Sequence, residues 1–161
     1  MSDKVPMTPA LRVLRKEKVP FEPFLYRYEE KGGTAASARA LGVDEHHVVK
    51  TLVFEDETGA PLIVLMHGDR SVSTKNLARL LGKKQITPCK PDVAQKHSGY
   101  QVGGTSPFGT RKQMPVYMEA SVAALDTIWL NGGKRGFLVS LNPADALRVL
   151  RAQTVEVGIE G

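Results

Sequence analysis

The sequence predicts a single α+β domain over residues 1–161, with a largely antiparallel or mixed sheet. Two observations support this fold class. Strand-like and helix-like segments follow one another without the strict alternation of a parallel α/β fold, and several neighbouring strand segments are joined by turns too short for a crossover helix. A length of 161 residues falls within the usual size of one domain and allows a sizeable core without disulfides or metals.

Helix segments are marked by a capping residue in front of an apolar stripe and by glycine after it. Proline in the first helical position strengthens this signal after Thr8 and after Asn142. The expected helices are 9–17 behind Thr8, a short alanine-rich helix capped by Thr34 and ended by Gly42, a helix from the Ser73 cap through Leu81, 91–96, 122–125, and a last helix from the Asn142 cap to Arg151.

Strand segments are short runs rich in β-branched and aromatic residues that lie between turn residues. The sequence DETGA at 56–60 predicts a hairpin connection, and Asn131, Gly132 and Gly133 predict a tight turn before a returning strand. The expected strands are 21–28, 48–54, 62–66, a short strand near Ile86, 116–118, 127–130, 137–141 and an edge strand at 155–159.

One strand segment, VVKTLVF at 48–54, has a lysine among apolar residues. Because a strand alternates its faces, Lys50 projects on the same side as Leu52 and Phe54, and neither face of the strand is polar. Lysine is seldom fully buried unless it is paired. Two interpretations therefore stand: Lys50 lies near an edge and reaches water, or it points into a pocket that holds an anion or a carbonyl group.

Residues 99–115 form a long segment without periodic apolar residues, and it contains four glycines and two prolines. Loops of this length in compact domains are usually functional or mobile. Within it, Gly103 and Gly104 would let backbone N–H groups approach a ligand closely and stabilise negative charge on an ester oxygen. The alternative is a plain turn, for which glycine pairs are common.

The usual catalytic and metal-binding patterns are missing from the sequence. The single cysteine, Cys89, excludes an internal disulfide and thiolate clusters, and it reads more readily as a packed side chain than as a nucleophile. Ser106 is followed at once by proline, which does not suit a nucleophile elbow. The histidines lack ligand spacing, so we expect no metal and no cofactor, and we interpret His46 and His47 as a surface pair.

The amino-acid composition limits which classes of partner the protein can bind. No apolar run is long enough for a membrane span and the first residues lack the apolar core of a signal peptide, so we expect a cytoplasmic protein with no membrane partner. The formal net charge of +5 permits a polyanion such as RNA as a partner without requiring one. With aromatic residues at 6%, a stacking platform for single strands is not expected.

Three segments occur together in one order: VVKTLVF at 48–54, GYQVGGTSPFGTRK at 99–112 and IWLNGGKRG at 128–136. In this combination the chain resembles the YbaK family of freestanding aminoacyl-tRNA deacylases, which is similar to the editing domain inserted in bacterial prolyl-tRNA synthetases. The resemblance runs from Met7 through the terminal helix. It implies a mixed, strongly curved, barrel-like sheet flanked by helices, with a pocket between the lysine strand and the glycine-rich loop.

The resemblance also implies a set of site residues. Lys50 matches the essential lysine of the family and would contact the phosphate or carbonyl end of the tRNA 3′ terminus, with Gly103 and Gly104 as catalytic backbone groups. The residues implied to contact the substrate are Tyr26, Thr51, Thr105, Ser106, Pro107, Gly132, Gly133, Lys134 and Arg135.

No side-chain nucleophile is implied, because the thiol of a mischarged cysteine is thought to attack its own ester carbonyl. Orientation and oxyanion stabilisation then matter more than a base. The GGKRG motif favours Cys-tRNA(Pro) deacylase, with mischarged tRNA and prolyl-tRNA synthetase as partners.

The chain departs from the family at Asn131, where serine is expected, and in EEKGGTAAS at 29–37, which is shorter and lacks an aromatic residue. Other substrates such as Ala-tRNA(Pro), hydrolysed by a bound water, therefore stay open. Two further hypotheses are a module that binds the tRNA end without chemistry and a small-ligand hydrolase that does not depend on tRNA.

Overall fold

A computed structural model describes residues 5–161, so the first four residues of the expected domain lie outside the described range. The described helices are short, and none of them is long and apolar enough to cross a membrane. They are α1 (Pro9–Lys16), α2 (Gly33–Leu41), α3 (Thr74–Leu81), α4 (Pro91–Ser98), α5 (Ala120–Ala123) and α6 (Pro143–Leu150), with a 3-10 turn η1 (Glu45–His47). As expected, Thr8, Ser73 and Asn142 each accept a backbone N–H bond at a helix start.

The strands confirm an α+β fold with a mixed sheet. They are β1 (Glu22–Leu25), β2 (Val49–Asp56), β3 (Pro61–His67), β4 (Arg70–Val72), β5 (Ile86–Pro88), β6 (Val116–Glu119), β7 (Ile128–Lys134), β8 (Phe137–Leu141), β9 (Gln153–Val155) and β10 (Gly158–Glu160). They form a five-stranded sheet in the order β5-β2-β3-β6-β9, a three-stranded sheet in the order β1-β8-β7, and the pair β10-β4.

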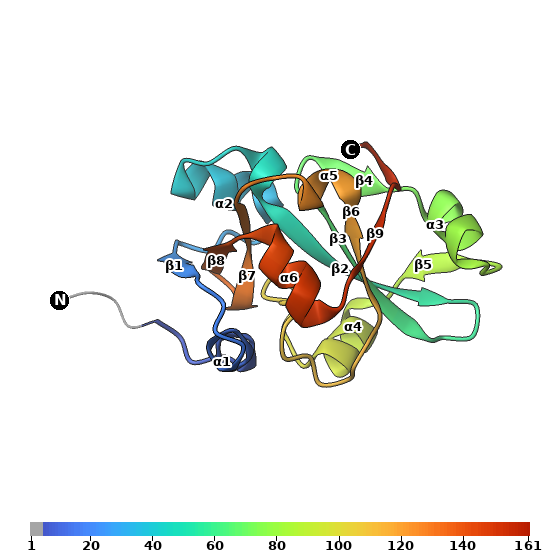
Figure 1. The fold of residues 1–161 in the computed structure, drawn as a ribbon, viewed down its shortest axis with the longest axis horizontal. Helices are drawn as coiled ribbons and strands as arrows, with labels where there is room; N and C mark the ends of the chain where they lie inside the picture. The colour runs from blue at the N-terminus through green and yellow to red at the C-terminus, as the bar shows by residue number, and fades with distance from the viewer. Residues whose placement is uncertain (1–4) are drawn as a thin grey trace.

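The hairpin of β2 and β3 lies at the centre of the molecule (Figure 1). Every residue of β3 is buried, and β6 adds to it in parallel. The faces of β2 pack into two different apolar clusters. Val49 and Val53 join a cluster with α1, β7 and β8, whereas Phe54 and the half-buried Leu52 join one with α3. The alternation expected for this strand is therefore present, with Lys50 on the side of Phe54.

The expectation of a strongly curved, barrel-like sheet is wrong, because none of the three sheets in the described residues is closed or strongly curled. To continue into the three-stranded sheet, β2 would have to pair along its outer edge. It instead meets β7 at one isolated parallel bridge, Val48 to Trp129. On the same edge it pairs with β5 only from Phe54 to Asp56. The edge between these points has no neighbouring strand, so the two sheets stay separate.

The tight turn expected at Asn131, Gly132 and Gly133 is also wrong. β7 continues to Lys134 with an irregularity between Asn131 and Lys134, and the turn follows at residues 135–136. The Asn131 side-chain oxygen accepts the N–H groups of Gly133 and Lys134 at 2.7 and 3.0 Å. This amide thus replaces ladder bonds inside a bulge, which allows the strand to continue.

Two smaller expectations need correction. Thr34 does not cap α2, because the helix begins at Gly33 and Gly32 is the N-cap residue. The Thr34 hydroxyl donates to Glu45 at 2.7 Å instead. The expected edge strand at 155–159 is divided into β9 and β10, which belong to different sheets. The buried Glu119 carboxylate accepts the N–H groups of Val157 and Gly158 and so holds the chain where it passes between them.

Thr8 ties α1 to β7 and gives a test of this packing. Its hydroxyl accepts the N–H of Leu11 at 3.2 Å and donates to the Gly132 carbonyl at 2.6 Å. We expect Thr8→Val to lower the free energy of unfolding by about 1–3 kcal/mol, because the cap and a buried carbonyl partner are both lost. Urea unfolding would measure this. Thr8→Ser, which keeps the hydroxyl, is the control; equal stabilities for the two variants would contradict the assignment.

Candidate functional site

A cavity of about 890 Å³ lies along the outer edge of β2, where that strand has no neighbour. Its walls come from β2, the first turn of α2, the segment from Pro88 to Ala94, and the loop around Gly103. The structure therefore brings the lysine strand and the glycine-rich loop to one cavity. The expected site residues that line it are Tyr26, Lys50, Thr51, Gly103, Thr105 and Arg135.

Lys50 is half-buried in this cavity, and its Nζ donates to the backbone carbonyl of Arg70. Burial lowers the pKa of Lys50, while the negative charges of Glu45 and Asp69 act in the opposite direction. The ammonium is thus poorly solvated and held by one carbonyl, with carboxylates close enough to favour the charged form. Of the two interpretations left open by the sequence, the structure has Lys50 lining a pocket.

The edge of β2 presents backbone groups as well as side chains. The N–H of Gly68 donates to the Val48 carbonyl and the N–H of Asp56 to the Ala60 carbonyl, so the even-numbered residues of β2 bond to β3. In an antiparallel pair the intervening residues direct their N–H and C=O groups to the other edge. Thr51 is such a residue, and its buried side-chain hydroxyl has no hydrogen-bond partner. The backbone N–H and C=O of Thr51 therefore offer a donor and an acceptor to a ligand in the cavity.

The glycine-rich loop is fastened to the β7–β8 hairpin. The Asn131 side chain donates to the Gly103 carbonyl at 3.1 Å, and Arg135 Nε donates to the Val102 carbonyl at 2.8 Å. The Arg135 guanidinium also lies 5.0 Å from the centre of the Tyr28 ring. Gly103 has a φ of +91°, and a Cβ there would lie 2.6 Å from the Tyr28 hydroxyl. The loop thus requires glycine at this position and is held in a fixed position.

The other expected site residues do not line the cavity. Gly104 is buried against the backbone of Lys134 and Arg135, and its N–H donates to the Gln101 carbonyl at 2.8 Å. In this structure the Gly104 N–H is thus engaged within the loop, and Gly104 packs against the β7–β8 hairpin. The hydroxyl of Ser106, fully buried, accepts the Phe108 N–H at 3.1 Å. Pro107, Gly132, Gly133 and Lys134 likewise lie outside the cavity wall.

Tyr26 and Cys89 contribute titratable groups to the cavity wall. Burial raises the pKa of Tyr26 above its usual value. Burial also raises the pKa of the Cys89 thiol to about 11, with a smaller contribution from the charge of Glu55. A thiol with this pKa stays protonated near neutral pH, which agrees with the interpretation of Cys89 as a packed side chain rather than a nucleophile.

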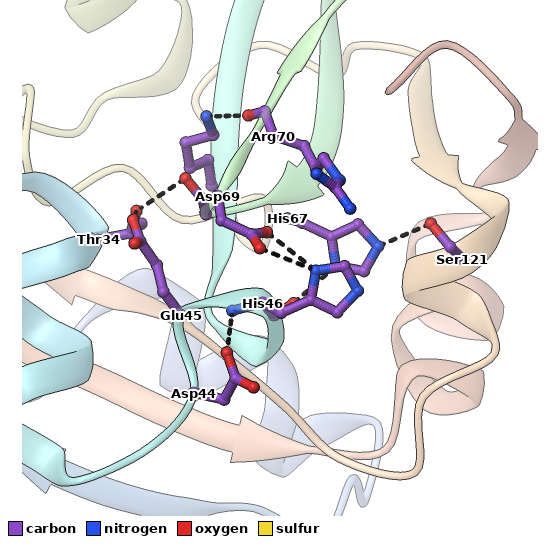
Figure 2. Close-up of polar contacts among 10 residues, drawn as sticks. Thr34, Asp44, Glu45, His46, His67, Asp69, Arg70 and Ser121 are labelled. Carbon is purple, nitrogen blue, oxygen red and sulfur yellow. Dashed lines mark hydrogen bonds and ion pairs between the residues drawn. The ribbon is translucent and has the colours of Figure 1, made fainter. Parts of the chain in front are cut away.

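A polar cluster of His46, His67 and Asp69 was not expected from the sequence (Figure 2), and it lies next to Arg70, whose carbonyl accepts from Lys50. His46 was interpreted as half of a surface pair with His47, but its ring stacks on the buried ring of His67 at 3.7 Å with an interplanar angle of 8°. Its Nδ1 lies 2.9 Å from Asp69 Oδ1. The sequence HGD at 67–69, directly after an expected strand, could have indicated this cluster. The hairpin register places His67 opposite Val49 and so brings it close to His46.

His46, His67 and Asp69 offer ligand atoms within 4.8 Å of one another, but their geometry does not suit a metal ion. Imidazole binds a metal through a lone pair in the ring plane at about 2.0–2.1 Å, and parallel stacked rings cannot aim two such lone pairs at one point. Both nitrogens of His67 are also engaged, Nδ1 with the His46 carbonyl at 2.6 Å and Nε2 with the Ser121 hydroxyl at 2.7 Å. Burial lowers the pKa of His67, which favours the neutral ring.

Comparisons with known proteins find a matching family and several similar proteins. The family described as "Aminoacyl-tRNA editing domain" matches residues 29–149. A protein of Enterococcus faecalis named "Putative Cys-tRNA(Pro)/Cys-tRNA(Cys) deacylase EbsC" is 29% identical over 93% of this chain and 92% of its own length. A proline–tRNA ligase of Nitratidesulfovibrio vulgaris is 30% identical over 65% of this chain, and the matching part is 17% of the ligase.

The fold has close counterparts among solved structures. The crystal structure of "hypothetical protein APE2540" superposes with a TM-score of 0.86 over 94% of this chain and 99% of that chain, at 20% sequence identity. The match therefore extends beyond the motifs to the arrangement of strands and helices. The chain belongs to the aminoacyl-tRNA editing domain family, which confirms its resemblance to the YbaK family.

Proposed function

We propose that this chain is a trans-editing deacylase that cleaves the ester of mischarged Cys-tRNA(Pro), and that residues 1–161 form one editing domain. The observation that supports this most is the shared cavity of Lys50 and Gly103 on the open edge of β2. Family membership supports ester cleavage on an aminoacyl-tRNA, and the name of the Enterococcus faecalis relative supports cysteine as the amino acid. Prolyl-tRNA synthetase is the partner that would supply such a substrate.

In this proposal the chain binds and orients the ester and supplies no nucleophile. The Lys50 ammonium contacts a phosphate or the ester carbonyl at the tRNA end. Backbone N–H groups of Gly103 and of Thr51 are the candidate donors to the oxygen on which negative charge develops. Arg135, fixed between the loop and Tyr28, adds positive charge at the mouth of the site.

The chemical step then uses the substrate's own thiol. Its sulfur forms a bond to the ester carbonyl carbon, the bond from that carbon to the ribose oxygen breaks, and the thiol proton passes to the ribose oxygen. The products are a cysteine thiolactone and free tRNA. A wall that holds the thiol near the carbonyl promotes this step by orientation alone.

Lys50→Ala tests the role of the ammonium. We expect the rate of amino acid release from Cys-tRNA(Pro) to fall by about 10²–10³-fold, because the charge that stabilises the developing oxyanion is removed. The control is Lys75→Ala, which alters an exposed lysine on α3 and should leave the rate unchanged. Circular dichroism would verify that both variants keep the fold; a folded Lys50→Ala variant with the wild-type rate would reject the role.

Cys89→Ser tests whether the protein contributes a thiol. Because burial keeps the Cys89 thiol protonated, we expect release of cysteine to stay within about twofold of the wild-type rate. Single-turnover kinetics with labelled Cys-tRNA(Pro) would measure it, with Cys89→Ala as a second variant of slightly smaller volume. A complete loss of release in both variants would mean that Cys89 acts as a nucleophile and that the substrate-thiol route is wrong.

The nature of the amino acid separates this proposal from its alternative. Release from Ala-tRNA(Pro) at a rate equal to that from Cys-tRNA(Pro) would favour hydrolysis by a bound water, because alanine carries no thiol. We expect cysteine release to exceed alanine release by more than about 200-fold, which is beyond the largest discrimination that a small size difference alone gives. Parallel assays on Cys-tRNA(Pro), Ala-tRNA(Pro) and Pro-tRNA(Pro) with wild-type protein would measure the ratio.

A further inference from the structure

The ammonium of Lys50 is held by a turn that belongs to a different part of the chain. Its partner, the Arg70 carbonyl, follows directly after the turn at residues 68–69 that joins β3 to β4. The Lys50 side chain has several freely rotating bonds, so its hydrogen bond to this carbonyl determines the position of the ammonium. The position of Lys50 in the cavity therefore depends on what fixes the turn.

Several contacts fix the turn, and Figure 2 shows those of Asp69. Both oxygens of the Asp69 carboxylate lie close to His46 Nδ1, at 2.9 and 3.2 Å. The Gly68 carbonyl oxygen lies 3.2 Å from the Thr34 hydroxyl oxygen, and the Gly68 N–H donates to the Val48 carbonyl at 2.6 Å. A Cβ at Gly68 would lie 2.6 Å from the same hydroxyl oxygen, so the turn is packed closely on this side.

His46 is in turn held from both sides. Its backbone N–H donates to the Asp44 side chain at 2.9 Å, and its carbonyl is bonded to Nδ1 of His67. The rings of His46 and His67 stack, and the Ser121 hydroxyl holds the far nitrogen of His67. The imidazole that binds Asp69 is thus held against the ring of His67, which belongs to β3 and is bonded to α5, and it cannot turn away without losing the stacking contact.

The same cluster surrounds Lys50 with charge. Glu45 and Asp69 are the carboxylates that favour its charged form against burial, and Arg70 and His46 are the cationic or titratable groups that face Asp69. Burial by itself would raise the pKa of Asp69, but the hydrogen bond and charge of His46 and the charge of Arg70 lower it overall. Asp69 therefore stays ionised at neutral pH.

We propose that Asp69, hydrogen-bonded to His46, is a positioning residue for Lys50, because it fixes the turn that presents the Arg70 carbonyl to the ammonium. Asp69 does not line the cavity and would not touch the substrate. The effect on rate rests on the proposed deacylase function. The effect on Lys50 itself does not.

Asp69→Asn is the sharpest variant, because asparagine keeps an oxygen that can accept from His46 but removes the charge. In Asp69→Asn we expect deacylation to lose rate with rising pH earlier than in wild type, since Lys50 loses its proton at lower pH without the nearby carboxylate. Asp69→Ala removes both the charge and the hydrogen bond to His46. We expect kcat to fall by about threefold to tenfold in this variant, a modest effect because the His46–Asp69 pair is about one-third exposed.

The matched control is Asp145→Asn, which removes an aspartate of a surface ion pair with Arg148 on α6, at 3.4 Å. This variant should keep the wild-type kcat and pH profile. A merely structural role for Asp69 would lower stability in Asp69→Asn without moving the pH profile of the remaining activity. Wild-type kcat in Asp69→Ala together with a wild-type pH profile in Asp69→Asn would overturn the proposal.

A second measurement does not depend on catalysis. In protein labelled with 15N-lysine, the Lys50 Nζ resonance can be assigned by its disappearance in Lys50→Arg and then titrated by NMR. We expect a lower Lys50 pKa in Asp69→Asn than in wild type and no change in Asp145→Asn. If wild type released no amino acid from any tRNA, the proposed function would fail, but this titration would still decide the role of Asp69. An unchanged Lys50 pKa would overturn it.

Discussion

The outer edge of β2 has no neighbouring strand at Thr51, between the Val48–Trp129 bridge and the bond from the Cys89 N–H to the Val53 carbonyl, and the cavity and its site follow from this gap. A central strand normally pairs on both sides, and a bare edge leaves backbone donors and acceptors without partners. Here the neighbours stop short: β5 pairs only from Phe54 onward, and β7 touches the strand at the single Val48–Trp129 bridge. The cavity fills this gap, so the backbone of Thr51 faces the space where a ligand would lie.

This arrangement explains why a lysine stands in an otherwise apolar strand. Lys50 is carried into the cavity by the strand itself, and the burial that lowers its pKa also leaves its charge poorly screened by water. A weakly solvated ammonium is a strong partner for an anion or a polarised carbonyl. The carboxylates of Glu45 and Asp69 offset part of the desolvation that disfavours the charged form of Lys50. The cluster around His46 therefore acts on the lysine that lines the cavity.

The parts of the fold that depend on local signals were predictable from sequence. Caps at Thr8, Ser73 and Asn142 mark helix starts, and the alternation of apolar residues places Lys50 on the Phe54 side of β2. The sequence could not show that Asn131 substitutes for ladder bonds and carries β7 through a glycine pair that usually marks a turn. That outcome depends on the surrounding structure.

The candidate site was predictable to the extent that its motifs contact the cavity directly. Lys50 and Gly103 line it, whereas Gly104 and Ser106, from the same motif, shape the loop from behind. The stacked rings of His46 and His67 were missed, because they are 21 residues apart and meet only through the register of the β2–β3 hairpin. A sequence motif thus indicates which segments form the site. The fold then determines which residues of the motif line the cavity and which hold the loop in place.

In the proposed function, the open edge of β2 and the loop at Gly103 bind the aminoacyl end of tRNA. The most direct measurement is an NMR titration of 15N-labelled protein with a non-hydrolysable cysteinyl-adenosine analogue. We expect the largest amide shifts at Thr51 and Gly103, with little change at Tyr117 and Val149, which line a separate depression beside α6. Saturable shifts confined to that second surface, with the Thr51 and Gly103 amides unshifted, would show that the tRNA end does not bind at the edge of β2.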